Sequence, residues 1–353
     1  LYTYRRCLFP FGIPILLPGI AKKKYAALLE KQPLMLEASE KSSFNKVEKA
    51  DKKLGIVACG IGYNYVKEAV GDDAYIIKIS QYPLPAKQIL SMAEDCDEIL
   101  VVEDGQPVVE EGVRNIIGDK AKVIGRLTGN LPRTGELTPD AVAVALGIPA
   151  PELFEPAKNL VARPPQLCQG CGHRDVYGAL VNILNEYPDA RVFGDIGCYT
   201  LGALPPFKAL ASCVDMGASI TMAKGAADAG LRPAIAVIGD STFTHSGMTG
   251  LLDAINDNSA ITVIISDNLT TGMTGGQDSA GTNKFEAICL GLGMDPAHLH
   301  VVTPLPKNIP AITQLIKDEI DYEGVSVIIP RRECIQTASR HAREKARNNK
   351  EAK

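Results

Sequence analysis

The stretch AIAVIGDSTFTHSGMTGLLDAINDNSAITVIISDN (residues 234–268) decides the fold. It begins with an apolar run of strand length, continues through a segment with helical spacing, and closes with a second apolar run. Each run ends in polar residues, GDS at 239–241 and DN at 267–268. Because short apolar strands that alternate with helices form parallel sheets covered on both faces, the stretch predicts a doubly wound α/β domain.

The polar ends of the two strands predict a site for a diphosphate and Mg²⁺. The carboxyl ends of parallel strands meet at one edge of a sheet, where open α/β sheets bind ligands. Asp240 and Asn268 supply a carboxylate and an amide oxygen there, which are ligands that Mg²⁺ prefers beside phosphate oxygens. Gly239 allows the backbone to approach an anion closely, and Ser241 offers a hydroxyl or an amide. The alternative is that these are ordinary turn residues at the ends of strands.

Outward from this stretch, the alternation of strand and helix continues along most of the chain. Apolar runs such as LGIVACG and EILVVED separate helical stretches from residue 54 to about residue 147. A proline-rich segment follows, in which neither a helix nor a central strand is expected. The chain is therefore divided into an N-terminal segment and linker helix (1–50), a first α/β domain (51–147), a linker (148–166), a second α/β domain (167–333) and a basic tail (334–353). The tail loses its apolar periodicity, so we expect it to lead out of the second domain.

The composition narrows the classes of function. With 353 residues, of which 46% are hydrophobic and 22% charged, the chain is long enough for two globular domains and is not typical of a disordered protein. A net charge of -4 leaves no basic surplus for nucleic acid, and no apolar run reaches the roughly 18 residues of a membrane helix. Neither nucleic acid nor a membrane is an expected partner. Arg5 and Arg6 precede an apolar stretch, but Pro10, Pro14 and Pro18 interrupt it, so no targeting leader is expected.

The nine cysteines do not form the pattern of a secreted disulfide framework, because their number is odd and they are spread along the chain. We expect reduced thiols and a cytoplasmic location. The exception is Cys168-x-x-Cys171, since two cysteines at this spacing can share a metal or a redox bond. Four others lie in apolar surroundings and are expected to be small core residues: Cys59, Cys96, Cys213 and Cys289.

Four motifs of the second domain carry a family resemblance. They are GDIGCYTLGALPP (194–206), DMGASITMAKG (215–225), GDSTFTHSGMTGL (239–251) and SDNLTTGMTGGQ (266–277). Together they resemble the thiamine diphosphate domain of 2-oxoacid:ferredoxin oxidoreductases, most closely the alpha subunits of the indolepyruvate type. LGIVACGIGYNYVKEA and LPRTGELTP extend the resemblance through the first domain. The resemblance implies two doubly wound domains, a transketolase C-terminal-like domain followed by a thiamine-diphosphate-binding domain of the pyrophosphate type.

The resemblance also implies an activity. An aryl 2-oxo acid of the indolepyruvate type would be oxidatively decarboxylated, with the acyl group passing to coenzyme A and the electrons passing through iron–sulfur clusters to ferredoxin. The implied cofactors are thiamine diphosphate, Mg²⁺ and a 4Fe–4S cluster. The implied protein partners are ferredoxin and a second (beta) subunit.

The family's functional residues transfer to matching positions of this sequence. Mg²⁺ is assigned to Asp240, Asn268 and Thr270, and the cluster to Cys168, Cys171, Cys198 and Cys334. Thiamine diphosphate is assigned to Asp195, Gly197, Met216, Gly217, Ala218, Gly239, Asp240, Ser241, Thr270, Thr271, Gly272 and Met273. His245 is the catalytic candidate, as a donor to the substrate carboxylate or a proton relay, although a packing role at a helix start is the alternative. His173 is expected either to orient the cysteine loop or to contact the pyrophosphate, and a purely structural role is the alternative.

Two other functions remain open at this point. An iron-free thiamine-diphosphate decarboxylase or synthase would use the same magnesium residues and leave the cysteines without a role. A non-catalytic subunit stabilised by zinc would use Cys168, Cys171, His173 and one further thiolate.

Family members also carry a pyrimidine-binding domain before the first domain and a ferredoxin-like module after the second. Because neither is recognised in this sequence, we expect a fragment that binds the cofactor weakly and is inactive when isolated.

Overall fold

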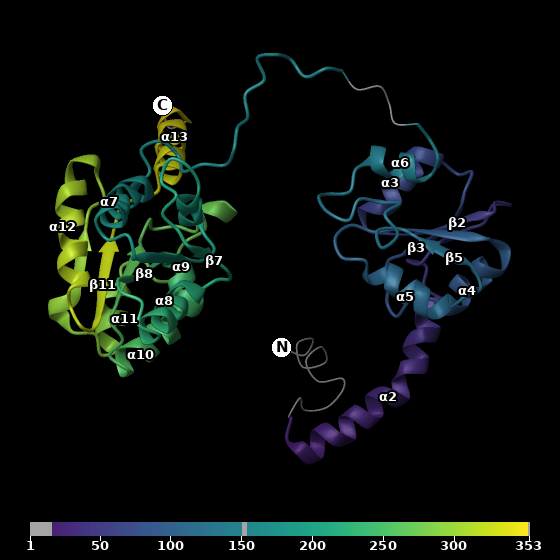
Figure 1. Cartoon of the computed structure of the whole chain (residues 1–353), viewed down its shortest axis with the longest axis horizontal. Helices are drawn as coiled ribbons and strands as arrows, with labels where there is room; N and C mark the ends of the chain where they lie inside the picture. The colour runs from purple at the N-terminus through teal and green to yellow at the C-terminus, as the bar shows by residue number, and fades with distance from the viewer. Residues whose placement is uncertain (1–15, 150–153, 352–353) are drawn as a thin grey trace. The chain divides into compact units, whose positions relative to one another are not determined.

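The computed structural model describes residues 16–149 and 154–351. The chain forms two compact units that divide between Lys158 and Asn159 (Figure 1). The expectation about a targeting leader falls on residues 1–15 and lies outside the described residues, as do residues 150–153 of the linker. Each unit is described by itself below.

The first unit is a doubly wound α/β sheet. It begins with the exposed linker helix α2 (Pro18–Glu40), followed by β1 (Val47–Glu48), β2 (Leu54–Cys59), α3 (Ile61–Val70), β3 (Tyr75–Ile79), α4 (Ala86–Asp95), β4 (Glu98–Val102), α5 (Val108–Ile117), β5 (Lys122–Ile124) and α6 (Pro139–Ala145). The strand order is β1-β3-β2-β4-β5, in which only β1 is antiparallel to its neighbour. Along β2, Ile56 packs with α3 and α6 while Val57 packs with α4 and α5. This alternation confirms that helices cover both faces of the sheet.

Glu48, on the edge strand β1, makes the stability of the first unit depend on pH in the acid range. Burial raises the pKa of its carboxyl, but ion pairs with Lys46 and Lys67 and a hydrogen bond from Tyr63 outweigh this and lower the pKa to about 2. A carboxyl whose pKa is lower in the folded than in the unfolded state stabilises the fold above the unfolded value, and this stabilisation is lost as the pH falls toward the folded value. The loss therefore falls between about pH 4.5 and pH 2.

The Glu48→Gln variant is expected to lower the free energy of unfolding at pH 7 by about 1 kcal/mol, a value reduced for solvent screening at the edge of the sheet. The difference from the unchanged chain should vanish near pH 2. Urea unfolding at both pH values measures it, with Glu68→Gln, on the exposed side of α3, as the matched control. A constant difference across the pH range would contradict the assignment.

The second unit is a six-stranded, fully parallel sheet in the order β10-β11-β9-β8-β6-β7. Its elements are α7 (Gly172–Glu186), β6 (Arg191–Gly194), η1 (Cys198–Ala203), β7 (Ser212–Cys213), α8 (Ala218–Asp228), β8 (Ala234–Gly239), α9 (Asp240–Thr242), η2 (Phe243–Gly247), α10 (Met248–Asn256), β9 (Ile261–Ser266), η3 (Gly272–Thr274), α11 (Phe285–Gly291), η4 (Pro296–His298), β10 (Leu299–Val302), η5 (Pro306–Asn308), α12 (Ile309–Ile320), β11 (Val325–Pro330) and α13 (Ile335–Glu351). The parallel α/β class predicted from residues 234–268 is confirmed.

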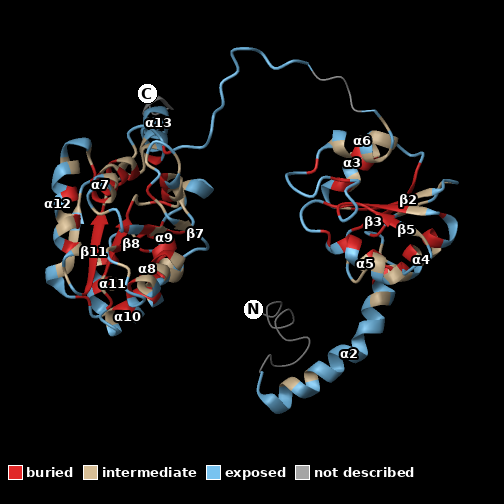
Figure 2. Ribbon diagram, viewed as in Figure 1, coloured by how far each residue is buried: buried red, intermediate tan, exposed pale blue. Residues whose placement is uncertain are grey.

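The central strands of the second unit are buried on both faces (Figure 2). Along β8, Ile235 and Val237 pack against α7 and α12, whereas Ala236 and Ile238 pack against α8, α10 and α11. The register pairs Gly239 at the end of β8 with Ser266 at the end of β9. The polar residues that follow these two strands therefore leave the sheet side by side, as predicted for Asp240 and Asn268.

The basic tail does not simply leave the second unit, contrary to expectation. Residues from Ile335 form the helix α13, in which Thr337 is buried and Arg340 donates hydrogen bonds to the backbone of residues 275 and 276. The periodicity was missed because only the first turns of α13 contact the domain, while later turns are exposed. Within the described part of the chain, no helix combines the length and the apolar character needed to cross a bilayer.

Candidate cofactor site

Asp240 and Asn268 converge at the carboxyl edge of the second sheet. Asp240 opens the helical run that follows β8 and is buried; its Oδ2 accepts from the amide of Thr270 at 3.1 Å and its Oδ1 from the amide of Ser241 at 2.6 Å. Asn268 Oδ1 accepts from the same Thr270 amide at 3.2 Å. Because one N–H group is shared by both oxygens, the carboxylate and the side-chain amide lie next to each other.

This donor set fits a magnesium ion. Burial raises the pKa of Asp240 to about 6 because the backbone hydrogen bonds to the carboxylate offset only part of its lost hydration, and a nearby cation would stabilise the charged form. Asp240, Asn268 and the carbonyl of Thr270 are all oxygen donors, which Mg²⁺ takes together with phosphate oxygens. Ser266 Oγ, at the end of β9, is buried without a hydrogen-bond partner, and the residue lines the same cavity.

A cavity of about 110 Å³ lies over these oxygens. Most of the sequence-predicted cofactor residues line it: Gly197, Met216, Gly239, Asp240, Ser241, Asn268, Thr270, Thr271, Gly272 and Met273. Ser241 Oγ and Thr271 Oγ1 are 2.6 Å apart, so a hydrogen bond links the segment after β8 with the segment after β9. His173 and Cys198, for which other roles were predicted, also line it, together with residues that were not predicted: Ile196, Tyr199, Thr242, Ser266 and Thr274. Most of these neighbour a predicted residue in the chain, and that adjacency was the available signal.

Asp195 does not line this cavity but holds together elements that border it. It is fully buried, and its carboxylate accepts hydrogen bonds from the amide and hydroxyl of Ser219, the amide of Gly217 and the hydroxyl of Tyr199. It therefore holds the N-terminus of α8 against the segment after β6. Asp195, Gly217 and Ala218 do not line the cavity, so the structure places them as supports of the lining residues.

His245 also lies outside the cavity lining. Its side chain is exposed on η2, where Nδ1 is 2.9 Å from Ser246 Oγ. The structure therefore places the catalytic candidate at the surface beside the site, with no described residue of the cavity in hydrogen-bond contact with its ring.

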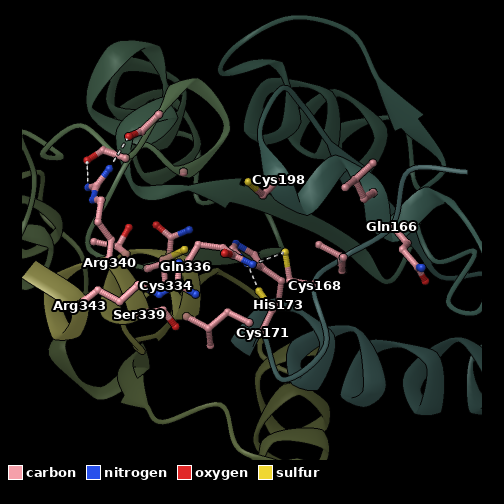
Figure 3. Close-up of a pocket in the computed structure, with 18 of the residues that line it drawn as sticks. Gln166, Cys168, Cys171, His173, Cys198, Cys334, Gln336, Ser339, Arg340 and Arg343 are labelled. Atoms are coloured by element: carbon pink, nitrogen blue, oxygen red, sulfur yellow. Dashed lines mark hydrogen bonds between the residues drawn. The ribbon is translucent and has the colours of Figure 1, made fainter. Parts of the chain in front are cut away.

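The four cysteines assigned to the cluster line a second cavity of about 570 Å³ (Figure 3). Cys168 and Cys171 precede α7, Cys198 begins η1, and Cys334 precedes α13, so three distant segments meet there. Burial, with smaller contributions from the neighbouring thiols, raises the pKa of Cys171 to about 11. Burial also raises the pKa of the Cys198 thiol. Buried thiols of this kind suit a positively charged inorganic group, which stabilises thiolates.

The cysteine side chains are spread around this cavity. Among the described residues, no three His, Cys, Asp or Glu side chains are grouped closely enough to hold a single metal ion.

Of the cysteines expected in the core, Cys96 and Cys289 are buried and Cys59 is half-buried, but Cys213 is exposed on the short strand β7. That expectation is wrong for Cys213 because β7 lies at the edge of the sheet.

His173 borders both cavities. Its Nδ1 lies 3.1 Å from Cys171 Sγ, and its ring stacks on Tyr199 with centroids 6.3 Å apart. Burial lowers the pKa of His173 to about 4, so the imidazole is neutral at pH 7. The ring thus contacts the cysteine loop and also lines the cavity beside Asp240 and Asn268.

Ion pairs and a backbone hydrogen bond fix the strand end that carries Asn268. Arg331, after β11, donates to Asp267 Oδ2 at 2.6 Å and to both carboxylate oxygens of Glu286 at 2.8 Å. The amide of Cys334 donates to the carbonyl of Asn268 at 3.0 Å. The proposed magnesium ligand and a proposed cluster ligand are thus joined directly through the backbone. The two cavities share four lining residues: His173, Cys198, Asn268 and Gly272.

Comparison with known proteins agrees with this geometry. Residues 195–328 match the family described as thiamine pyrophosphate enzyme, C-terminal TPP binding domain. The chain is 33% identical over 356 residues to the indolepyruvate oxidoreductase subunit IorA of Archaeoglobus fulgidus, covering 93% of this chain and 56% of that protein. The subunit of the same name from Thermococcus kodakarensis is 34% identical over 360 residues, covering 90% of this chain and 55% of that protein.

Among solved structures, a 2-oxoglutarate:ferredoxin oxidoreductase from Magnetococcus marinus aligns with a TM-score of 0.40 and 20% identity, over 52% of this chain and 71% of that one. The chain spans about half the length of the curated relatives it matches. The resemblance read from the four motifs is confirmed. Over about nine-tenths of its length the chain is thus similar to the indolepyruvate oxidoreductase subunits, and its residues 195–328 match the C-terminal TPP binding domain of thiamine pyrophosphate enzymes.

Proposed function

We propose that this chain holds thiamine diphosphate, Mg²⁺ and a 4Fe–4S cluster as part of an oxidoreductase acting on 2-oxo acids. Its substrate would be an aryl 2-oxo acid of the indolepyruvate type, with coenzyme A as acyl acceptor, ferredoxin as electron acceptor and a second subunit as partner. The eight described cysteines are all free thiols, which is compatible with the proposed cytoplasmic location.

The observation that carries the proposal is the wall shared by the two cavities. An oxygen-lined site that fits Mg²⁺ lies directly beside a four-cysteine site, with Asn268 and Cys198 lining both. Electron removal from a bound substrate requires an acceptor at short range. An iron-free decarboxylase would have no use for four cysteines at this position, so the shared wall favours an oxidoreductase.

The chain's own residues would hold the cofactor and shape its surroundings. Asp240, Asn268 and the carbonyl of Thr270 would anchor Mg²⁺ on the diphosphate, while the backbone around Gly239 approaches the phosphates closely. When bound, thiamine diphosphate supplies the carbon that attacks the oxo group and accepts the electrons left after carbon dioxide departs. The neutral imidazole of His173 places no competing positive charge between the two cavities.

The spread of the cysteines favours a cluster over the zinc alternative. A single zinc ion with bonds of about 2.3 Å would need its thiolates within about 3.8 Å of one another. A 4Fe–4S cluster binds each thiolate on a different iron, so its ligands lie farther apart around a larger volume. The cavity of about 570 Å³, which all four cysteines line, has room for the second arrangement.

Metal analysis of the anaerobically purified chain, with its absorbance spectrum and a thiamine diphosphate titration in Mg²⁺, tests the proposal. We expect about four iron and four sulfide per chain, visible cluster absorbance, and binding of thiamine diphosphate that EDTA abolishes. Thiamine diphosphate binding without iron would support the iron-free decarboxylase or synthase. Zinc without thiamine diphosphate binding would support the non-catalytic subunit, and either result would overturn the proposal.

A further inference from the structure

The loop of residues 271–277 forms part of the wall between the two cavities. Thr271 to Thr274 line the smaller cavity, while Gly272, Gly275 and Gly276 line the larger one. The loop is closed by hydrogen bonds from the Thr271 amide to the Gln277 carbonyl at 2.8 Å and from the Gly276 amide to the Thr271 carbonyl at 3.0 Å. A local displacement of this loop would therefore alter both cavities.

Arg340 holds this loop from the side of α13 (Figure 3). Its Nη1 donates to the carbonyl of Gly275 at 2.9 Å and its Nη2 to the carbonyl of Gly276 at 3.1 Å. Both glycines have positive φ values, 121° and 81°, so the turn that presents these carbonyls is one that other residues rarely adopt. A Cβ atom on Gly276 would come within 2.9 Å of the Arg340 guanidinium, which shows how closely the two fit.

The start of α13 is tied to the same segment of chain. Cys334 immediately precedes the helix, and its carbonyl accepts the amide of Ala338 at 2.9 Å. The amide of Cys334 in turn donates to the carbonyl of Asn268 at 3.0 Å. The segment from Asn268 to Gly276 is thus held at one end by a cysteine of the cluster site and at the other by Arg340, and α13 connects the two.

We propose that α13, through Arg340, is a positioning element that keeps the 271–277 loop in its thiamine-binding form and links the affinity for thiamine diphosphate to occupancy of the four-cysteine site. The link rests on the function proposed above. Because coupling between two binding sites is reciprocal, a cluster that fixes Cys334 strengthens thiamine diphosphate binding, and thiamine diphosphate stabilises the cluster.

The test measures the thiamine diphosphate dissociation constant of the full chain by calorimetry in Mg²⁺, together with hydrogen exchange of residues 271–277. Arg340→Ala should weaken binding about fivefold, since two exposed hydrogen bonds to the loop are lost, and should speed exchange of the loop with iron content unchanged. Arg340→Lys should recover part of both effects. The matched control is Lys345→Ala, an exposed residue farther along α13 that lines neither cavity.

The coupling is tested by repeating the titration after the iron has been removed. We expect the unchanged chain to bind thiamine diphosphate several-fold more weakly without iron, and Arg340→Ala to lose most of this difference. Equal affinity and equal loop exchange in Arg340→Ala and Lys345→Ala would overturn the inference. If the unchanged chain binds no thiamine diphosphate, the proposed function and the coupling both fail, and the exchange data then report the structural tether alone.

Discussion

Replacing Asp240 by asparagine is expected to weaken thiamine diphosphate binding in Mg²⁺ by at least about 100-fold, because even outer partners of metal ligands cost about 10- to 100-fold when lost. Asp240 is the one carboxylate in a donor set otherwise made of the Asn268 amide and the Thr270 carbonyl. Asparagine keeps the shape of the side chain and one acceptor oxygen but removes the negative charge that compensates Mg²⁺. Calorimetric titration with thiamine diphosphate measures the loss.

The stability of the chain separates this loss of ligand from misfolding. Because burial disfavours the charged Asp240 carboxylate when no cation is bound, Asp240→Asn should leave the melting temperature of the ligand-free chain unchanged or raise it. The matched control, Asp253→Asn on the exposed side of α10, should bind thiamine diphosphate as the unchanged chain does. Unaltered binding by Asp240→Asn would show that the magnesium site lies elsewhere.

The magnesium donors were predictable from the sequence because they depend on a general property of parallel sheets. Asp240 and Asn268 each follow an apolar run, and the register of β8 with β9 then brings the two ends together. The supporting role of Asp195 was not predictable in the same way. It occupies a strand end too, but its carboxylate faces the N-terminus of α8, and the sequence does not say which polar strand end faces the ligand.

The contact between α13 and the 271–277 loop was also beyond the sequence. Charged segments with few apolar residues, such as 335–351, are typical of solvated chain ends. The two hydrogen bonds of Arg340 go to backbone carbonyls, which every residue has, so the sequence does not indicate them. The edge strands β7 and β10 are hard to predict from the sequence for a related reason. Each is short and only partly buried, so neither has the continuous apolar run of a central strand.

For the cysteines, the family resemblance predicted a group of four ligands that their spacing in the sequence alone did not predict. Cys168 and Cys171 stand out as a pair, but Cys198 and Cys334 are single cysteines in separate segments. Their proximity depends on the sheet order, which places β6 and β11 on either side of β8 and β9. The side-chain pattern also gave no sign that Cys213 is exposed while Cys289 is buried.

Replacing Cys171 or Cys334 by serine is expected to remove the cluster, lowering iron from about four atoms per chain to less than one and abolishing the visible absorbance. Each residue is partly buried at the cavity, where serine is a poor replacement for a thiolate. The backbone hydrogen bond from residue 334 to Asn268 survives the change, so the fold of the strand end is expected to persist. Cys289→Ser is not a suitable control because Cys289 is a core residue, whereas Cys213→Ser, at an exposed site outside both cavities, should retain full iron.

The expected difference between Cys168→Ser and Cys171→Ser makes the assignment more specific than a simple loss of metal. Cys168 is exposed, with Gln336 Nε2 at 3.6 Å from its Sγ, so serine or water can approach the iron it would hold and part of the cluster should persist. Cys171 is less exposed than Cys168 and its Sγ contacts His173, so we expect a replacement ligand to reach its iron less readily. Iron content after anaerobic reconstitution should therefore fall less in Cys168→Ser than in Cys171→Ser. Full iron in both variants would show that these cysteines do not bind the cluster, and the oxygen-lined cavity would then have no electron acceptor beside it.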